Sequence, residues 1–465
     1  MRYNWIDEFL LNKRGVTKDL QTDWNWIRYQ VGGKMFAAIC LDEDNKPYYI
    51  TLKLEPSEGD FLRQQYEDII PGFYMNKVHW NSVKPDGEVP DDLLKDLLEK
   101  SYKLVLSGFS KKRQREIIGL SCCDSDKVEA EGNVITYADK YIDLHLHLDG
   151  AITPQIAKKL AAVQGIDLPA DDDFELEKLL TVPENCTSLN DFLKCFALPD
   201  SLMMTKEGLS EAVYLVAENV KSQGVIYAEI RFAPQLHTEK GMSQEDAVQA
   251  ALEGLKRTDL KANLILCCMR GEGNEDANYE TVELARKYLV EDGGVTGIDI
   301  AGAEALYPTS NYAGIFAKAK EYGIPFTIHA GEADGAESVR YAIEYGAARI
   351  GHGVRIKEDD SVVELVKEKG IYLEMCPTSN RQTHAVSDMS DYPLIDYLNK
   401  GIKVTLNTDD MAIEGITLAD EYRYMERDFG LTAGQEKIML ANSIDAAFTS
   451  EAVKNELRKA LGFEV

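Results

Sequence analysis

YIDLHLHLDG, residues 141–150, alternates between apolar and polar side chains along its whole length. Because alternate side chains of a β-strand point to opposite faces, His145, His147 and Asp149 are expected on one face. At about 3.3 Å per residue, Asp149 is expected roughly 13 Å along the strand from His145. Gly150 is expected to end the strand and let the chain turn away. This face indicates a functional site, although a His-x-His pair alone also fits buried polar structure.

The chain from residue 139 onward repeats a rhythm of strand and helix. Strands are predicted at residues 141–148, 224–233, 261–269, 295–301, 325–330, 348–352, 371–376 and 403–408. Eight parallel strands alternating with helices over about 325 residues are typical of a (β/α)8 TIM barrel. The gap of about 75 residues between the first two strands predicts a long insertion after strand 1. The predicted fold class is therefore α/β.

The first part of the chain has a different pattern. Residues 1–116 are typical of a small α+β domain, with helices expected near 4–13, 57–68 and 91–106 and strands at 26–31, 34–41, 47–54 and 79–84. Residues 117–138 are charged and lack a persistent period, which is typical of a linker. We therefore predict that a small domain and a linker precede a barrel domain at residues 139–465.

The charge of the chain is unevenly distributed. Its 51 lysines and arginines against 79 aspartates and glutamates give a net charge of −28. Residues 1–120 hold 18 basic and 19 acidic residues, a net of −1, so residues 121–465 carry the other −27. Such an acidic barrel disfavours general affinity for nucleic acid, which needs a basic surface.

The composition also bears on the compartment of the protein. No run of about 20 apolar residues occurs, so no membrane span is expected. The first fifteen residues lack the pattern of a secretory signal. The eight cysteines match neither a disulfide framework nor a zinc ribbon. Reduced thiols in a cytoplasmic protein are the expected state.

Chemically active residues gather where the predicted strands end. His145 and His147 stand at the end of the first strand, and His329, His352 and Asp409 follow the fifth, sixth and eighth. Because TIM-barrel active sites lie at the carboxyl ends of the strands, these side chains are expected to converge. Three converging imidazoles and a carboxylate from such a set can form a divalent-metal site of zinc type. We predict one zinc ion per chain.

Six motifs in the barrel segment resemble those of one enzyme family. In chain order they are HLHLDGA (145–151), DIAG (299–302), HAGE (329–332), RIGHG (349–353), EMCPTSN (374–380) and LNTDD (406–410). Together they resemble the adenosine deaminase family, within the metal-dependent amidohydrolases, over residues of about 140–450. The resemblance implies that zinc is held by His145, His147, His329 and Asp409. It makes Glu332, His352 and Asp409 the catalytic residues.

The resemblance also implies contacts to the substrate. Gly302 would offer its backbone N–H to purine N3, and Asp410 would pair with N7. Asp149 would meet the ribose 5′-hydroxyl beside His147, which also borders the substrate. For Asp410, support of the metal ligands is the alternative. The apolar gate of the family is matched by Leu189, Phe192 and Leu193, whose helical spacing fits core packing equally well.

The implied reaction agrees with elementary chemistry. Hydrolytic deamination adds water to C6 of adenine and expels ammonia. Zinc lowers the pKa of bound water from 15.7 toward about 7, and His352 would orient the resulting nucleophile. Attack moves electrons onto N1, so a protonated carboxyl of Glu332 would act as a general acid there.

The first domain resembles another family. QQYEDIIPG (64–72) and MNKVHWNSV (75–83) are the most specific parts of a resemblance to the MmcQ/YjbR family over residues 3–116. Members are small α+β domains with a CyaY-like fold and are often described as DNA-binding. Because the net charge here is near zero, an interaction module or regulatory appendage is favoured over nucleic-acid binding.

We predict zinc-dependent deamination of adenosine and 2′-deoxyadenosine, a purine-salvage reaction with a small-molecule nucleoside as partner. The family members that act on free adenine carry Glu where Asp149 stands, so the shorter side chain favours a nucleoside. Deamination of free adenine or another 6-aminopurine is the alternative. A binding protein built on a degenerate barrel is disfavoured by the complete metal set and by Glu332.

Overall fold

The computed structural model contains two compact units, residues 1–134 and 135–465. It describes the chain except residues 1, 4, 12, 22–23, 43, 55–58, 60–61, 64, 73–74, 76, 78, 108, 110–116, 118–138, 171, 183–194 and 464–465. The predicted linker lies almost wholly outside the described residues, so its limits stay a prediction. No helix in the described part is both long and apolar enough to cross a membrane.

The second unit is the predicted barrel. Its strands are β7 (Tyr141–His147), β8 (Val225–Phe232), β9 (Lys261–Met269), β10 (Val295–Ala301), β11 (Thr327–Ala330), β12 (Arg349–His352), β13 (Tyr372–Met375) and β14 (Lys403–Leu406). All eight predicted strands are confirmed, with bounds that shift by at most two residues. Most of their residues are buried, because barrel side chains pack on both faces.

The strands pair in two parallel four-stranded sheets. One has the order β10-β9-β8-β7 and the other β11-β12-β13-β14. Parallel bridges between Leu146 and Asp409 and between Ile298 and Phe326 join the two sheets at their edges. The eight strands therefore form one closed circle, and their carboxyl ends face the same side.

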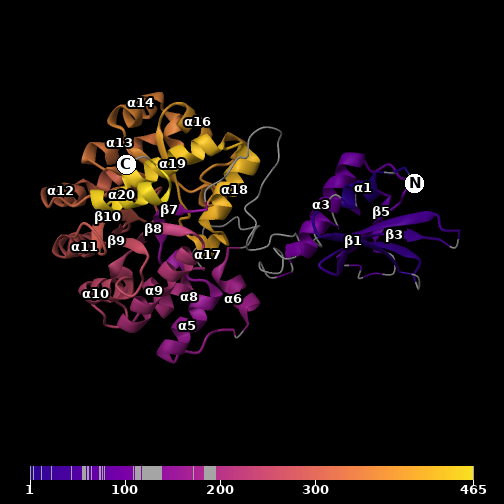
Figure 1. Cartoon of the computed structure of the whole chain (residues 1–465), viewed down its shortest axis with the longest axis horizontal. Helices are drawn as coiled ribbons and strands as arrows, with labels where there is room; N and C mark the ends of the chain where they lie inside the picture. The colour runs from indigo at the N-terminus through magenta and orange to yellow at the C-terminus, as the bar shows by residue number, and fades with distance from the viewer. Residues whose placement is uncertain are drawn as a thin grey trace. The chain divides into compact units, whose positions relative to one another are not determined.

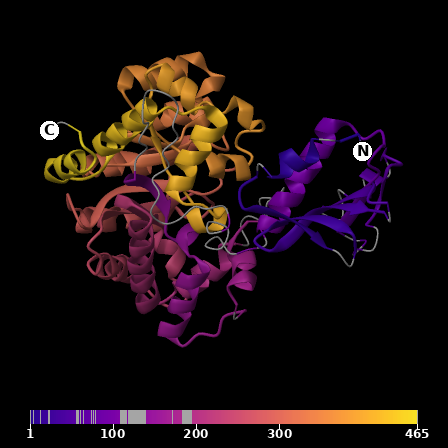
Figure 2. The same ribbon diagram turned by 45° about the vertical axis from the view of Figure 1, so that its right-hand side comes forward.

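Helices surround the strands (Figures 1 and 2). They are α5 (Pro154–Gln164), α6 (Asp173–Leu180), α8 (Ala197–Leu202), α9 (Lys206–Ser222), α10 (Gln244–Leu255), α11 (Glu275–Tyr288), α12 (Ala313–Glu321), α13 (Ala336–Tyr345), α14 (Asp360–Lys369), α15 (Pro377–Gln382), α16 (Leu394–Asn399), α17 (Met411–Glu414), α18 (Leu418–Phe429), α19 (Ala433–Ala446) and α20 (Glu451–Ala460). Helices α5, α6 and α8 belong to the long insertion predicted after strand 1.

The first unit is a sheet with helices against it. Its strands are β1 (Val16–Gln21), β2 (Trp26–Val31), β3 (Lys34–Leu41), β4 (Pro47–Lys53), β5 (Ile69–Pro71) and β6 (Trp80–Val83), in the antiparallel order β1-β2-β3-β4-β6-β5. Helices α1 (Ile6–Leu11) and α3 (Asp91–Ser107) bury the apolar core of this unit against the sheet. Of the helix expected near 57–68, residues 59, 62–63 and 65 are helical, and residues 57–58, 60–61 and 64 lie outside the described part of the chain.

Strand β7 ends earlier than the alternation predicts. It stops at His147, and Asp149 begins a 3-10 turn, η1 (Asp149–Ala151). The expectation that Asp149 continues the strand of His145 is therefore wrong, since Asp149 lies in the turn that follows. A side-chain oxygen of Asp149 lies within 4.8 Å of a ring nitrogen of His147.

Candidate functional site

Four side chains meet at the carboxyl ends of β7, β11 and β14. Nε2 of His329 lies 3.0 Å from Nε2 of His145 and 3.2 Å from Nε2 of His147. Oδ1 of Asp409 lies 3.3 Å from Nε2 of both His145 and His147. A tetrahedral ion with ligands at about 2.0–2.1 Å separates those ligands by about 3.3 Å. These four distances match that spacing, so the four side chains could hold a metal ion.

The outer nitrogens of two of these histidines determine which nitrogen faces the centre. Nδ1 of His145 lies 2.8 Å from Oε2 of Glu374, and Nδ1 of His329 lies 2.8 Å from Oδ2 of Asp299. A carboxylate beside Nδ1 keeps the proton there and leaves the lone pair of Nε2 free. Lone pairs facing one another at this distance repel, so the residues fit a bound cation.

Buried arginines hold the two carboxylates in place. Arg231 donates to Oδ2 of Asp299 at 2.6 Å and to Oε2 of Glu374 at 2.9 Å. Nε of Arg349 lies 2.5 Å from Oε1 of Glu374, and its Nη2 donates to Glu229 at 2.5 Å. All five side chains are fully buried. Although burial raises it, the charges of both arginines hold the pKa of Glu374 well below its ordinary value.

His352 faces the same centre from β12. Its Nε2 lies 3.6 Å from Oδ2 of Asp409 and 3.6 Å from Oε2 of Glu332. The Tyr392 hydroxyl donates to Oδ1 of Asn380, so the Asn380 amide nitrogen faces Nδ1 of His352 at 3.1 Å. An acceptor at Nδ1 implies that the proton of the neutral ring is on Nε2. Burial lowers the pKa of His352 to about 3, which keeps the ring neutral.

The backbone is strained at this centre. His352 has φ of 62° and Asp409 has φ of 66°, in the left-handed region that non-glycine residues seldom adopt. Such strain costs of order 1–3 kcal/mol per residue and persists only where the surroundings enforce it. Asp409 is held there by β-type contacts, since its N–H donates to the carbonyl of His145 and its carbonyl accepts from His147.

Glu332 stands in the turn after β11, beside the four residues that could hold a metal, His145, His147, His329 and Asp409, which we call the metal group. The Thr383 hydroxyl donates to its Oε1 at 3.2 Å, and His352 faces its other oxygen. Burial raises the pKa of Glu332 to about 8, and the charges of Asp409 and Glu304 act in the same direction. A carboxyl that keeps its proton near neutral pH can act as a general acid.

A cavity of about 720 Å³ opens above these groups. It is lined by five of the predicted metal-binding and catalytic residues, His147, His329, Glu332, His352 and Asp409. The predicted substrate-binding residues Asp149, Gly302 and Asp410 line it as well. His145 lies beneath them, fully buried. The predicted gate residues Leu189, Phe192 and Leu193 lie outside the described residues.

Glycine is needed at position 150 for a different reason from the one expected. It does not simply release the chain at the end of the strand, because Asp410 packs directly on it. A Cβ at position 150 would lie 2.6 Å from Cα of Asp410, closer than real Cβ atoms approach. Oδ1 of Asp410 is buried without a hydrogen-bond partner in the described part of the chain. Burial, and then the charge of Asp409, raises the pKa of Asp410 well above its ordinary value.

Asp200 is a cavity residue that the sequence did not reveal. It lies on α8, which packs against η1, and it lines the cavity together with Asp149. Its Oδ1 is buried without a hydrogen-bond partner among the described residues. Burial raises its pKa to about 7, and the charges of Asp149 and Glu239 add to that shift. Burial likewise raises the pKa of Asp149 to about 6.

Three other residues with reactive side chains, Cys376, His384 and His237, are less suited to the chemistry or lie elsewhere. Cys376 is buried, its Sγ within hydrogen-bond range of the Glu374 carbonyl, and burial raises its pKa far above the range of a nucleophile. His384 lines the cavity. His237 is buried outside it, and burial lowers its pKa to about 4.

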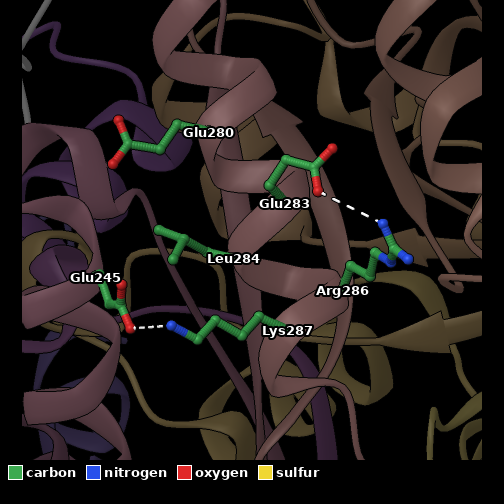
Figure 3. Close-up of a pocket in the computed structure, with 6 residues that line it drawn as sticks. All are labelled: Glu245, Glu280, Glu283, Leu284, Arg286 and Lys287. Atoms are coloured by element: carbon green, nitrogen blue, oxygen red, sulfur yellow. Dashed lines mark hydrogen bonds and ion pairs between the residues drawn. The ribbon is translucent and has the colours of Figure 1, made fainter.

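A second hollow lies on the outer surface between α10 and α11 (Figure 3). Glu245 pairs with Lys287, and Glu283 pairs with Arg286. Because both of its basic residues are paired with carboxylates and no candidate site residue lines it, this hollow is not the candidate site.

Several residues of the site were not predicted from the sequence. Glu374 and Asp299 are the first residues of the motifs EMCPTSN and DIAG, so their membership of these motifs could have indicated both. Thr383, Glu304 and Asp200 stand in loops or short helices with no pattern of their own. Only the closure of the barrel brings them to the cavity.

Comparison with known proteins shows which families this chain matches. The family profile for adenosine deaminase matches residues 141–462, and the profile for YjbR matches residues 11–104. The adenosine deaminase of Haemophilus ducreyi is 48% identical over 326 residues, which cover 69% of this chain and 94% of that protein.

Two solved structures resemble the barrel. The adenine deaminase of Arthrobacter aurescens matches with a TM-score of 0.62 and 27% identity, over 70% of this chain and 98% of its own. The N6-methyl-AMP deaminase of Arabidopsis thaliana matches with a TM-score of 0.60 and 26% identity, over 70% of this chain and 96% of its own. The names of these similar proteins give them different substrates, namely adenosine, adenine and N6-methyl-AMP.

Proposed function

Because this chain belongs to the adenosine deaminase family and is a hydrolytic deaminase, we propose that it converts adenosine and 2′-deoxyadenosine to inosine and 2′-deoxyinosine. One observation carries the proposal. Of the four residues with closely spaced ligand atoms, His147, His329 and Asp409 line the same cavity as Glu332, whose pKa is raised. A metal group beside a proton donor is what addition of water to C6 and protonation of N1 require.

His145, His147, His329 and Asp409 would hold one zinc ion. When bound, zinc supplies a water molecule acidified to near neutral pH. The protein groups then have separate tasks. Nε2–H of His352 points toward Asp409 and Glu332 and orients the attacking oxygen between them. Glu332 donates its proton to N1 as the electrons of the C6–N1 bond move onto that nitrogen.

The purine ring is held on its other edges. Gly302, with φ of 105°, presents backbone at the end of β10, where its N–H would meet N3. Asp410 would donate a proton to N7, since its Oδ1 has no partner among the described residues. A hydrogen bond to N7 needs a protonated carboxyl because N7 is an acceptor. The proton of the hydroxyl added at C6 then passes to the amino group, the C6–N6 bond breaks, and ammonia leaves the 6-oxo product.

The sugar side of the cavity, defined by Asp149 and Asp200, favours a free nucleoside. Carboxyl oxygens can accept a hydrogen bond from the ribose 5′-hydroxyl, whereas a 5′-phosphate would bring negative charge toward two acidic groups. The identity to adenosine deaminases, 38–48% in the relatives compared, favours the same substrate. Free adenine is the second candidate, because the Arthrobacter aurescens adenine deaminase has the same barrel.

A substrate panel tests the proposal. Ammonia release should be measured with adenosine, 2′-deoxyadenosine, adenine and AMP, and methylamine release with N6-methyl-AMP. We expect the highest kcat/KM for the two nucleosides. A higher kcat/KM for adenine or a nucleotide would overturn the substrate assignment and leave the metal assignment standing. Full activity after exhaustive chelation would instead overturn the metal assignment.

A further inference from the structure

Glu304 is the most heavily hydrogen-bonded carboxylate beside the cavity. It stands in the turn after β10, two residues beyond Gly302, and is 2% exposed. Its Oε1 accepts from the N–H of Gly331 at 2.7 Å, and its Oε2 accepts from the N–H of Glu332 at 3.1 Å. Oε2 also accepts from the N–H groups of residues 333 and 334 at 2.8 and 3.0 Å. The Ser338 hydroxyl donates to Oε1 at 2.5 Å.

Four successive N–H groups that point at one anion form a nest, which fixes the backbone that contains them. Gly331 makes this geometry accessible, because its φ of 71° lies in the left-handed region. Bonds from N–H groups to a carboxylate are charge-assisted and stronger than bonds between neutral groups. The loop 331–334 is therefore held mainly by a side chain from a different strand end.

The same network reaches the metal group. Ser338 Oγ lies 2.7 Å from Thr309 Oγ1, which accepts from Nη2 of Arg270 at 2.9 Å. Nη2 of Arg270 also donates to the carbonyl of His329 at 2.6 Å. The loop is thereby tied to the backbone of a predicted metal ligand. Arg270 is the residue that makes this connection.

We propose that Glu304 is a positioning residue that clamps the loop 331–334 and so aims the carboxyl of Glu332 at the purine N1. The inference rests on the proposed function of Glu332 as the proton donor. Glu304 itself touches the loop backbone and supports catalysis only through Glu332.

Glu304→Gln is the direct test because the side chain keeps its length. Whichever oxygen the amide nitrogen replaces, at least one N–H donor of the loop faces another donor. We expect kcat for adenosine to fall by about 10–100-fold, as for a displaced general acid, while KM changes by less than about threefold. Zinc content should stay at the wild-type value. Inhibition by 1-deazaadenosine, which lacks N1, should also be unchanged.

A double-mutant cycle separates positioning from general damage. If Glu304 acts through Glu332, then Glu304→Gln should cost less than about threefold in a Glu332→Gln background. A loss of the same size in both backgrounds would overturn the inference. If Glu332→Gln alone kept normal kcat, the proposed function of Glu332 would fail instead. The two failures are therefore distinguishable.

Two further variants guard the test. Ser338→Ala removes one donor to Glu304 and should show a smaller loss, about 2–10-fold, that also vanishes in the Glu332→Gln background. It replaces Glu304→Gln if that variant does not fold. Asp292→Asn is the matched control, because Asp292 accepts from the N–H of Ser450 in a loop that does not line the cavity. It should lower Tm and leave kcat unchanged, and a fall in kcat there would remove the specificity of the test.

Discussion

The metal group and the sugar side of the cavity both consist of buried polar side chains, but their surroundings differ. Nδ1 of His145 and Nδ1 of His329 each face a carboxylate, and an arginine holds both carboxylates. On the sugar side, Oδ1 of Asp200 has no partner in the described part of the chain, and Asp149 accepts from the adjacent N–H of Gly150.

The difference teaches where geometry and where charge determine function. A metal site needs ligands fixed within a few tenths of an ångström, and two of the proposed ligands, His145 and His329, each have a buried carboxylate beside Nδ1. A sugar hydroxyl needs an acceptor that the substrate itself completes. Changes at the metal group should therefore abolish turnover, whereas changes on the sugar side should alter the choice of substrate.

Loss of a metal ligand should have the largest effect. His329→Ala or Asp409→Ala removes one of the four closely spaced ligand atoms. Without the ion, the pKa of water returns toward 15.7, so we expect turnover to fall by more than about 10⁴-fold. Metal content by atomic emission should fall with it. A variant that kept both zinc and turnover would contradict the assignment of that ligand.

Loss of the proton donor should come next and should spare the metal. Glu332→Gln keeps the shape of the side chain but cannot deliver a proton to N1. We expect kcat to fall by about 10²–10⁴-fold, the usual contribution of general acid catalysis. Zinc content, measured on the same sample, should equal that of the wild type. Loss of zinc in this variant would mean that Glu332 belongs to the metal group.

The buttress of the metal group should have an intermediate effect. Glu374→Gln removes the carboxylate beside Nδ1 of His145, and changes of this kind cost about 10–100-fold in metal affinity. Glu229→Gln is the matched control, because Glu229 pairs with Arg349 in the same buried network and touches no metal ligand. Competition with a zinc chelator should separate the two variants. Equal zinc affinity in both would show that the network acts only on stability.

Much of this architecture could be predicted from the sequence, because local patterns determine it. The barrel strands are apolar runs between turn residues, and a parallel barrel brings their carboxyl ends together whatever lies between them. His145, His147, His329 and Asp409 could be located for that reason. In the first unit, the short β5 and the largely exposed β1 were missed, since VTKDLQ has no buried face that alternates.

The rest depends on contacts between distant segments. Glu304 binds a loop that begins 27 residues later, and nothing near Glu304 indicates four N–H donors. The 3-10 turn at Asp149 was missed because an alternating pattern does not show where a strand ends. At this turn Asp410 packs closely on Gly150, and the two residues are 260 positions apart. Such contacts appear only once the fold is known.

Removing the charge of Asp149 tests the sugar side directly. Asp149→Asn keeps one acceptor oxygen and weakens the bond to the 5′-hydroxyl, so kcat/KM for adenosine should fall by about tenfold. The kcat/KM for adenine, which has no sugar, should change little and serves as the internal control. Zinc content should be unchanged. An equal fall with both substrates would mean that Asp149 supports the metal group instead.

Asp200 should give the smallest effect, a pH dependence of substrate choice. Its pKa is raised to about 7 by burial and by the charges of Asp149 and Glu239, so the carboxyl gains a proton as the pH falls through that value. Below pH 7 one negative charge is lost from the sugar side, and the ratio of kcat/KM for AMP to that for adenosine should rise by about threefold between pH 8 and pH 6. The phosphate of AMP titrates near pH 6 and contributes to this trend. Asp200→Asn isolates the contribution of the protein, because the variant should show a higher ratio at pH 8 and a flatter profile. Identical profiles in the two proteins would show that Asp200 does not sense the 5′ position.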